Sequence, residues 1–359
     1  MLVLLNTLII LPSAQASHVG VVRSVQGNEA NIVARLSAHR GAVYGLLSAG
    51  LGKGHRANPA ASLRVEAVFG VPVLLSGLAS LVLSAKEENL IGQHYKVHVQ
   101  RLLRLHQATP APVVFLLAGC LPLPAQLHIK MFSLFGQLCR LRDGDNILAA
   151  RARSIFSAAS ASTRSWFWRI RQLCLQYGLP HPLDWIYSRP SKQLVKSKVK
   201  AAVTEYWLDQ LRTKADTLSS LQYLRTKYLG LSKSHPIFRS CGSSPWEVEK
   251  GTTQARLLSG RFRVEALTGH WDPGNREGLC TLPECWRTLD WHKGSVEHFL
   301  LSCPSLSSAR QTLHMFNLRY LETNPHLEPI VNDCLEINPV QSVSISIVMS
   351  KFIMWTVES

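Results

Sequence analysis

The sequence predicts a mainly α protein, with a short pair of strands at its N-terminus, a helical bundle, a helical linker and a small cysteine- and histidine-containing module. Three observations predict this class. Apolar residues recur at helical spacing through much of the 359-residue chain. Proline and glycine interrupt these runs at intervals. Three cysteines and a histidine gather near the C-terminus, and with 46% hydrophobic residues the chain can build real cores.

The same observations divide the chain into five regions. Residues 1–24 hold the strands, 25–142 a helical domain, 143–250 a basic helical linker, 251–310 the cysteine- and histidine-containing module and 311–359 a C-terminal tail.

Two strands are predicted first, over Leu2–Leu11 and His18–Arg23. The apolar start also allows another reading, because Ala14-Gln15-Ala16 resembles a signal-peptidase site. No Lys or Arg precedes that site, and the widely spaced cysteines are not typical of a secreted disulfide framework. An intracellular location, nuclear or cytoplasmic, is therefore favoured over secretion.

Local signals place the helices of residues 25–142. A first helix follows Asn28, with Arg35, His39 and Arg40 mostly off its apolar face. Asn58-Pro59 starts a second helix, and the S-x-x-E box at Ser84 starts a third. The residues predicted to point inward from the third helix are Leu90, Ile91, His94, Val97, Leu102 and Leu105.

Two strongly apolar runs, Val71–Leu83 and Ala111–Leu123, are shorter than the ~18 residues of a transmembrane helix. Glycine or proline also interrupts both runs. We interpret them as buried helices and expect no membrane partner.

Residues 143–250 carry the aromatic residues and the longest basic helix. The aromatic residues of Ser165–Tyr187 favour a core patch, with base stacking as the alternative. A helix is predicted over Ser191–Lys227, in which Lys192, Lys196 and Lys200 share one face beside a stripe of valines. Another helix is predicted over Thr252–Leu267.

The charge is large and uneven. The net charge is +16; residues 1–142 have 13 Lys and Arg against 4 Glu, and residues 189–239 have 11 against 3 acidic residues. The last residues, 304–359, have 3 basic against 5 acidic. Two basic blocks indicate contact with a polyanion such as RNA or DNA.

Catalytic motifs are absent from the sequence. The first aspartate is Asp143, and no adjacent Asp-Asp pair exists to hold two metal ions. No phosphate-binding loop, nucleophile elbow or H-E-x-x-H motif is present. We therefore expect no catalytic residues and no small-molecule substrate.

The cysteine-histidine array is Cys280, Cys285, His298 and Cys303, with the spacing C-x4-C-x12-H-x4-C. Three cysteines and one histidine are the ligand set of a closed structural zinc site. The competing interpretation is a small buried hydrophobic group beside an ordinary helix histidine. His292 is a substitute ligand if the register slips.

Several stretches resemble, in order, the C-terminal part of a non-LTR (LINE-type) retrotransposon reverse transcriptase. His18–Val21 resembles the strand that ends its palm, and Ile32–Gly54 its first thumb helix. Val71–Leu83 resembles the next thumb helix, with Ser76 and Ala79 where the family has Tyr and Glu. The similarities nearer the C-terminus are Leu116–Pro122, a later turn, and Glu297–Pro304, half of the family's Cys/His motif.

This resemblance implies a residual palm, a thumb-like domain and a zinc motif that contact nucleic acid. The family's Tyr-Ala-Asp-Asp box is not in the sequence, so we expect a truncated, inactive copy with that box upstream. The implied contacts to RNA or DNA backbone are Arg35, Arg40, Lys53, Arg56, Lys192, Lys196, Lys198 and Lys200.

Two alternatives remain open. A retroelement endonuclease would need a Pro-Asp and an acidic-x-Lys pair after the motif, where the tail offers only Asp333 and Lys351 without that pairing. A secreted structural protein would begin after cleavage at the N-terminal site.

Overall fold

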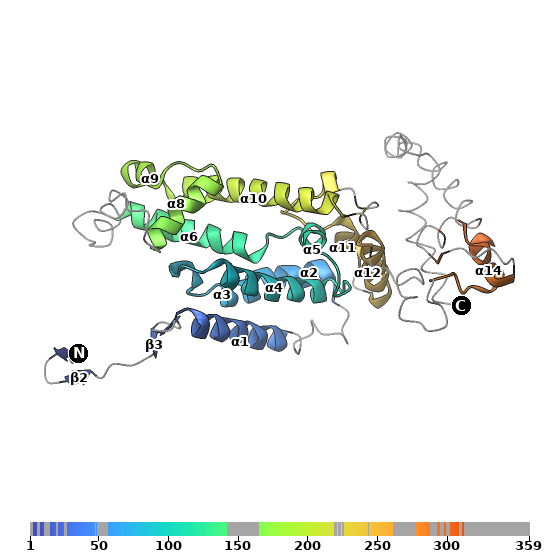
Figure 1. The fold of residues 1–359 in the computed structure, drawn as a ribbon, viewed down its shortest axis with the longest axis horizontal. Coiled ribbons are helices and arrows are strands. Elements are labelled where there is room, and N and C mark those ends of the chain that lie inside the picture. Colours follow the sequence, from blue (N-terminus) through green and yellow to red (C-terminus); the bar gives the residue numbers. More distant parts are fainter. Residues whose placement is uncertain are drawn as a thin grey trace. The chain divides into compact units, whose positions relative to one another are not determined.

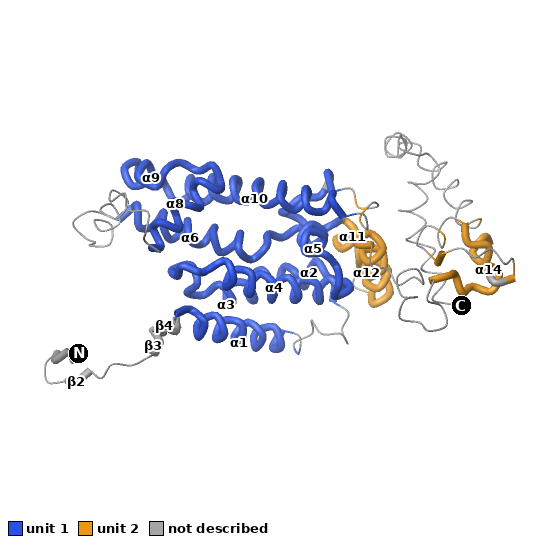
Figure 2. Tube along the Cα trace, viewed as in Figure 1, with its two compact units in different colours: residues 1–218, 225–235 blue, residues 219–224, 236–359 orange. Residues whose placement is uncertain are grey.

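The computed structural model describes residues 3–5, 8–10, 15–18, 21–24, 27–46, 48, 57–141, 165–218, 221, 224, 226–242, 244–260, 278–287, 293–294, 298, 302–308 and 311. The chain forms two compact units (Figure 2). Unit 1 comprises residues 1–218 and 225–235, and unit 2 comprises residues 219–224 and 236–359. The described residues confirm that the protein is mainly α.

Two antiparallel strand pairs precede the helices. β1 (Val3–Leu5) pairs with β2 (Leu8–Ile10), and β3 (Gln15–His18) pairs with β4 (Val21–Ser24). The prediction of one strand over each apolar run is wrong, because Leu5 pairs with Leu8 and His18 with Val21. An apolar run does not by itself show where a chain reverses.

The described part of unit 1 is a stack of helices. Its helical elements are α1 (Glu29–Leu46), α2 (Pro59–Val65), the π-helix η3 (Glu66–Gly70), α3 (Val71–Leu74), η4 (Leu78–Ser80), α4 (Ala85–Leu102), α5 (Ala111–Ala118), α6 (Leu123–Arg140), α8 (Trp166–Gln176), α9 (Pro182–Ser188), α10 (Lys192–Asp216) and η6 (Thr226–Tyr228).

These helices form successive layers (Figure 1). α1 packs on α3 and α4, α4 packs on α5 and α6, and α6 and α5 pack on α10. α1 and α10 therefore lie on opposite sides of unit 1, with the other layers between them. Within the described residues no single helix is long and apolar enough to cross a membrane, and α5 with α6 meets that criterion only as a pair bent by 62°.

The predicted helix starts at Asn58 and Ser84 are confirmed. The Asn58 side chain accepts a hydrogen bond from the Ala60 N–H at 2.8 Å. Ser84 and Glu87 form a reciprocal capping box, in which the Ser84 N–H donates to the Glu87 carboxylate at 2.6 Å. Each contact satisfies an N–H group that the helix itself leaves without a partner.

α10 ends at Asp216, before the predicted limit of Lys227. Beyond it the chain folds back along the helix. The Arg212 guanidinium donates to the carbonyls of Lys227 and Leu229 at 2.8 and 2.7 Å, and the Thr226 hydroxyl donates to Asp216 at 2.7 Å. These side chains stabilise the return, which the spacing of apolar residues could not indicate.

The buried faces of α1 and α4 correct the predicted ones. His39 was predicted mostly off the apolar face of α1 but is 1% exposed. On α4, Leu90 and Val97 were predicted inward and are 51% and 40% exposed, whereas Tyr95 and Val99 are buried. The buried residues Ile91, Tyr95 and Val99 are spaced four apart along α4 and therefore share one face. Leu90 and Val97 lie off that face.

The prediction of a core patch over residues 165–187 is confirmed for Tyr177 and Trp185, which are buried, and is wrong for Tyr187, which is 74% exposed. Trp185 is buried and stacks on Phe135 with ring centroids 6.0 Å apart. Phe132 lies 6.0 Å from Trp185 and 6.4 Å from Tyr177. These rings join α6, α8 and α9.

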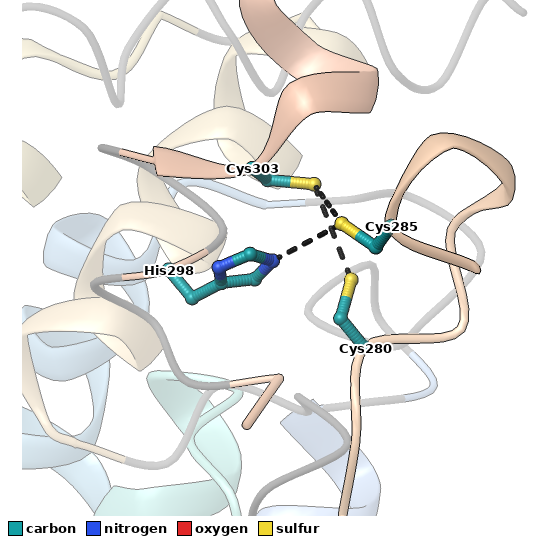
Figure 3. Close-up of side chains that lie close together, drawn as sticks. All are labelled: Cys280, Cys285, His298 and Cys303. Atoms are coloured by element: carbon teal, nitrogen blue, oxygen red, sulfur yellow. Dashed lines mark hydrogen bonds between the residues drawn. The ribbon is translucent and has the colours of Figure 1, made fainter. Parts of the chain in front are cut away.

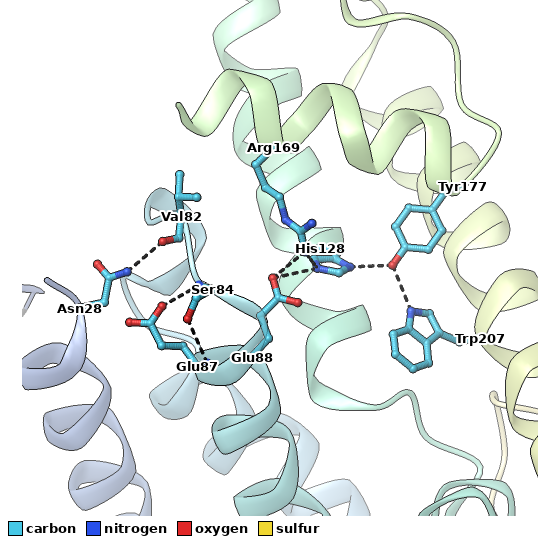
Figure 4. A network of polar contacts seen from close by, with 9 residues as sticks. All are labelled: Asn28, Val82, Ser84, Glu87, Glu88, His128, Arg169, Tyr177 and Trp207. Atoms are coloured by element: carbon cyan, nitrogen blue, oxygen red, sulfur yellow. Dashed lines mark hydrogen bonds and ion pairs between the residues drawn. The ribbon is translucent and has the colours of Figure 1, made fainter. Parts of the chain in front are cut away.

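A chain of polar contacts links α4, α6, α8 and α10 (Figure 4). Arg169 donates to the Glu88 carboxylate at 2.7 Å, and His128 Nε2 lies 3.6 Å from the same oxygen. His128 Nδ1 lies 2.6 Å from the Tyr177 hydroxyl, which accepts from Trp207 Nε1 at 3.1 Å. Burial raises the pKa of Glu88, but His128 and Arg169 lower it by more, so the pKa lies below its ordinary value.

Unit 2 contains α11 (Pro236–Ser240), α12 (Pro245–Leu258), α14 (Pro283–Arg287) and η9 (Pro304–Leu306). α12 begins at Pro245, capped by Ser244, and not at the predicted Thr252. α12 also ends at Leu258, before the predicted Leu267, and Gly260 just beyond it has a left-handed backbone conformation. Residues 142–164, 261–277 and 312–359 lie outside the described residues.

Candidate metal centre

Short segments of unit 2 bring the predicted ligands together. Cys280 follows Leu279, which forms an antiparallel bridge with Lys293. Cys285 lies within α14, and Cys303 directly precedes η9. Figure 3 shows the side chains of these two cysteines, Cys280 and His298 directed toward one another.

The distances between these side chains fit a four-coordinate ion. Cys285 Sγ lies 3.3 Å from His298 Nε2 and 3.4 Å from Cys303 Sγ, and Cys280 Sγ lies 4.0 Å from Cys303 Sγ. All four ligand atoms lie within 4.8 Å of one another. A tetrahedral zinc ion would place two sulfurs about 3.8 Å apart, and a sulfur and a nitrogen about 3.6 Å apart.

The cluster is closed to solvent. Its side chains are 6% (Cys280), 4% (Cys285), 6% (His298) and 0% (Cys303) exposed, and Leu282 and Leu306 pack against the cysteines. The sulfurs of Cys285 and Cys303 are too far apart for a disulfide, whose S–S bond is about 2.05 Å. A buried His among three free thiols is a donor set that could hold a metal ion.

Backbone and side-chain hydrogen bonds hold the cluster in place. The Gly294 N–H donates to the Gly278 carbonyl at 2.8 Å, which closes the chain around Cys280. The Glu284 N–H donates to the Ser305 hydroxyl at 3.0 Å, which joins α14 to η9. The Cys303 N–H donates to the His298 carbonyl at 2.7 Å.

His298 is also oriented from its other nitrogen. Nδ1 lies 3.3 Å from the Ser302 hydroxyl. A proton on Nδ1 donated to that hydroxyl leaves the lone pair of Nε2 toward the sulfurs. Hydrogen-bond partners of this kind fix the tautomer that a metal requires.

The pKa values of the Cys280 and Cys285 thiols are raised in the absence of a metal. Burial raises the pKa of Cys285 to about 12, and the neighbouring Cys303 and Cys280 add to the increase. Burial also raises the pKa of Cys280. Three buried thiolates without a cation would be very unfavourable, so an ion that replaces their protons can stabilise the cluster.

The structure does not bring the predicted nucleic-acid contacts into one patch. Lys192, Lys196, Lys198 and Lys200 are all exposed on α10. Arg35 is half-buried and Arg40 exposed on α1, on the opposite side of unit 1. Lys53 and Arg56 lie outside the described residues.

Sequence reasoning missed a second buried group in unit 1, formed by His39, Glu66, His94 and His98. The spacing of the last two, four residues apart on α4, was a signal that could have drawn attention to it.

Comparison of the chain with protein-family models, with curated proteins and with solved structures found no match.

Proposed function

We propose that this chain is a non-catalytic nucleic-acid-binding fragment of a LINE-type reverse transcriptase. In this proposal its basic helices contact the backbone of RNA or DNA, and its Cys/His cluster holds a structural zinc ion. The ordered sequence similarities support the family, and the charge of α10 together with the donor set in unit 2 supports the binding role.

Zinc is the ion that this donor set favours. Thiolates select soft or borderline ions, and three sulfurs with one imidazole in a closed tetrahedral arrangement suit Zn²⁺. Cys280, Cys285, His298 and Cys303 would fill all four positions. The ion would then stabilise the fold of its module and have no position for a reacting water.

The lysine row of α10 is the observation on which the binding proposal depends. Val195, Val199 and Val203 are at most 4% exposed and fix the rotation of the helix. Lys192, Lys196 and Lys200 follow in the next row, roughly 100° around the helix, and are exposed. Lys198 lies in the row on the other flank.

The helix dipole adds to the positive potential of this row. The first turn of α10 contains no acidic residue and begins with Lys192. Cations near a helix N-terminus oppose the dipole, so they do not stabilise the helix. The positive end of the helix dipole and the exposed lysines together give this end of α10 a positive potential, which attracts phosphate.

Binding at different salt concentrations tests this proposal. We expect the triple variant Lys192→Gln, Lys196→Gln, Lys200→Gln to bind labelled RNA and duplex DNA more weakly, measured by fluorescence anisotropy. The slope of log affinity against log salt should fall by about 0.9 for each lost contact on duplex DNA and about 0.7 on a single strand.

The matched control removes three other exposed lysines of unit 1, Lys86, Lys214 and Lys233. This control has the same net charge as the Lys192/Lys196/Lys200 variant. Its nucleic-acid affinity should keep most of the wild-type dependence on salt concentration. Equal losses in both variants, or wild-type binding that salt does not weaken, would contradict the proposal.

A further inference from the structure

Three helical elements of unit 1 bring one carboxylate and three imidazoles together. His39 is on α1, Glu66 begins η3, and His94 and His98 lie one turn apart on α4. His39 Nε2 is 2.8 Å from one Glu66 oxygen, and His98 Nε2 is 2.9 Å from the other. The ligand atoms of His39, Glu66 and His98 all lie within 4.8 Å of one another.

The group is enclosed by the bundle. His39 and Glu66 are 1% and 3% exposed, and His98 is 11% exposed. A buried carboxylate needs a compensating cation, because an unpaired charge in the protein interior is very unfavourable. One protonated imidazole compensates the carboxylate, and protonation of the second would place two imidazolium rings with centroids 5.0 Å apart. A divalent cation bound by Glu66 and by two neutral imidazoles compensates the carboxylate in the same place, with the ring nitrogens as ligands instead of proton donors.

His94 occupies the position of an outer partner. Its Nε2 lies 3.0 Å from His39 Nδ1. When His39 Nδ1 carries the proton and donates it to His94 Nε2, the lone pair of His39 Nε2 faces Glu66, where an ion would bind. Metal-bound histidines almost always have such a partner at the second ring nitrogen.

The local backbone is adapted to the carboxylate. Glu66–Gly70 is a π-helical turn between α2 and α3. This geometry is rare in proteins, and where it occurs it is often found at functional sites. A Cβ atom at Gly70 would overlap the Glu66 carboxylate. Glycine at this position therefore leaves the room in which the carboxylate lies.

We propose that His39, Glu66 and His98 form a second metal site, which takes a divalent transition ion such as Zn²⁺, with His94 orienting His39. Two imidazoles and one carboxylate are an established donor set for zinc. Zinc–donor bonds of about 2.0–2.2 Å place two donor atoms about 3.4 Å apart. The nitrogens of His39 and His98 would therefore have to move about half an ångström farther from the Glu66 oxygens to bind an ion.

Cobalt distinguishes this site from the cysteine cluster. Co²⁺ bound to thiolates gives an intense near-ultraviolet charge-transfer band, and Co²⁺ bound to imidazole and carboxylate gives none. The full-length triple variant Cys280→Ser, Cys285→Ser, Cys303→Ser should bind one Co²⁺ or Zn²⁺ per chain without that band, measured by absorption and by elemental analysis.

The reciprocal variants are Glu66→Gln and His98→Gln, both of which keep a hydrogen-bonding group of similar size. Each should bind one ion fewer than the wild type and keep the full thiolate band. His106→Ala, which removes an exposed imidazole from the same unit, should bind as many ions as the wild type.

No bound ion in the cysteine triple variant, with the helical circular dichroism of unit 1 intact, would overturn the proposal. So would Glu66→Gln and His98→Gln variants that bind as many ions as the wild type. A wild-type protein without the thiolate band, whose only ion is lost in these two variants, would support this site and count against the cysteine cluster alone.

Discussion

Glu88 shows how single side chains hold the layers of unit 1 together. It projects from α4 and receives a 2.7 Å hydrogen bond from Arg169 of α8, and the pair is 15% and 28% exposed. A charged hydrogen bond in such a place contributes about 1.5–3 kcal/mol. The lowered pKa of Glu88 connects this contact to acid stability.

The Glu88→Gln variant should therefore be less stable than the wild type at neutral pH, by about 1.5–3 kcal/mol. Because the folded pKa is lowered, the contribution of Glu88 is complete above the unfolded pKa of about 4.3 and is lost as the pH falls through the folded value. The difference in unfolding free energy between the two proteins should shrink below about pH 4. Urea unfolding at several pH values measures it.

Glu205→Gln, which removes an exposed carboxylate from α10, is the matched control and should leave stability nearly unchanged. A Glu88→Gln deficit that stays constant down to strongly acidic pH would refute the assignment.

At the scale of elements, helix ends are set locally and helix faces are not. The capping box of α4 uses only Ser84 and Glu87, three residues apart, and the sequence was sufficient to predict it. The buried group around Glu66 joins residues 27 and 32 positions apart, so no local pattern could predict it. The same limit explains the incorrect faces of α1 and α4, because the neighbouring helix decides which side is buried.

Ser84→Ala should lower the unfolding free energy by about 1 kcal/mol, because the Glu87 N–H loses its hydrogen-bond acceptor. Ser76→Ala, at an exposed position of the same unit, should change stability by less than about 0.5 kcal/mol. Denaturant unfolding of both variants compares them; equal effects would show that the cap does not stabilise α4.

At the scale of the whole molecule, the two units are held by different means. Unit 1 has layered helices with apolar side chains between them, whereas the described part of unit 2 around the cluster has only Leu282 and Leu306 packed on the cysteines. Residue types and spacing were sufficient to predict that these four side chains come together. The backbone that brings them together was not predictable, since 12 residues separate Cys285 from His298. If this cluster holds zinc, as we propose, the ion would stabilise unit 2 through an apparent binding free energy of about 10–16 kcal/mol, the value for structural zinc sites.

Cys303→Ser should therefore lower the zinc content by one ion per chain and expose unit 2 to limited proteolysis while unit 1 stays resistant. Cys174→Ser, at an equally buried cysteine of unit 1, should keep every zinc ion. Elemental analysis after gel filtration and mapping of the first cleavage sites check both outcomes. Full zinc retention by Cys303→Ser would argue against coordination by this thiol.

The layering of unit 1 also constrains how a nucleic acid can engage it. α3, α4, α5 and α6 separate the arginines of α1 from the lysines of α10. A straight duplex lying along one helix cannot reach the other. Contact with both helices at once would require either one strand that wraps around the bundle or two separate nucleic-acid molecules. The number of nucleic-acid molecules bound per chain distinguishes these two arrangements.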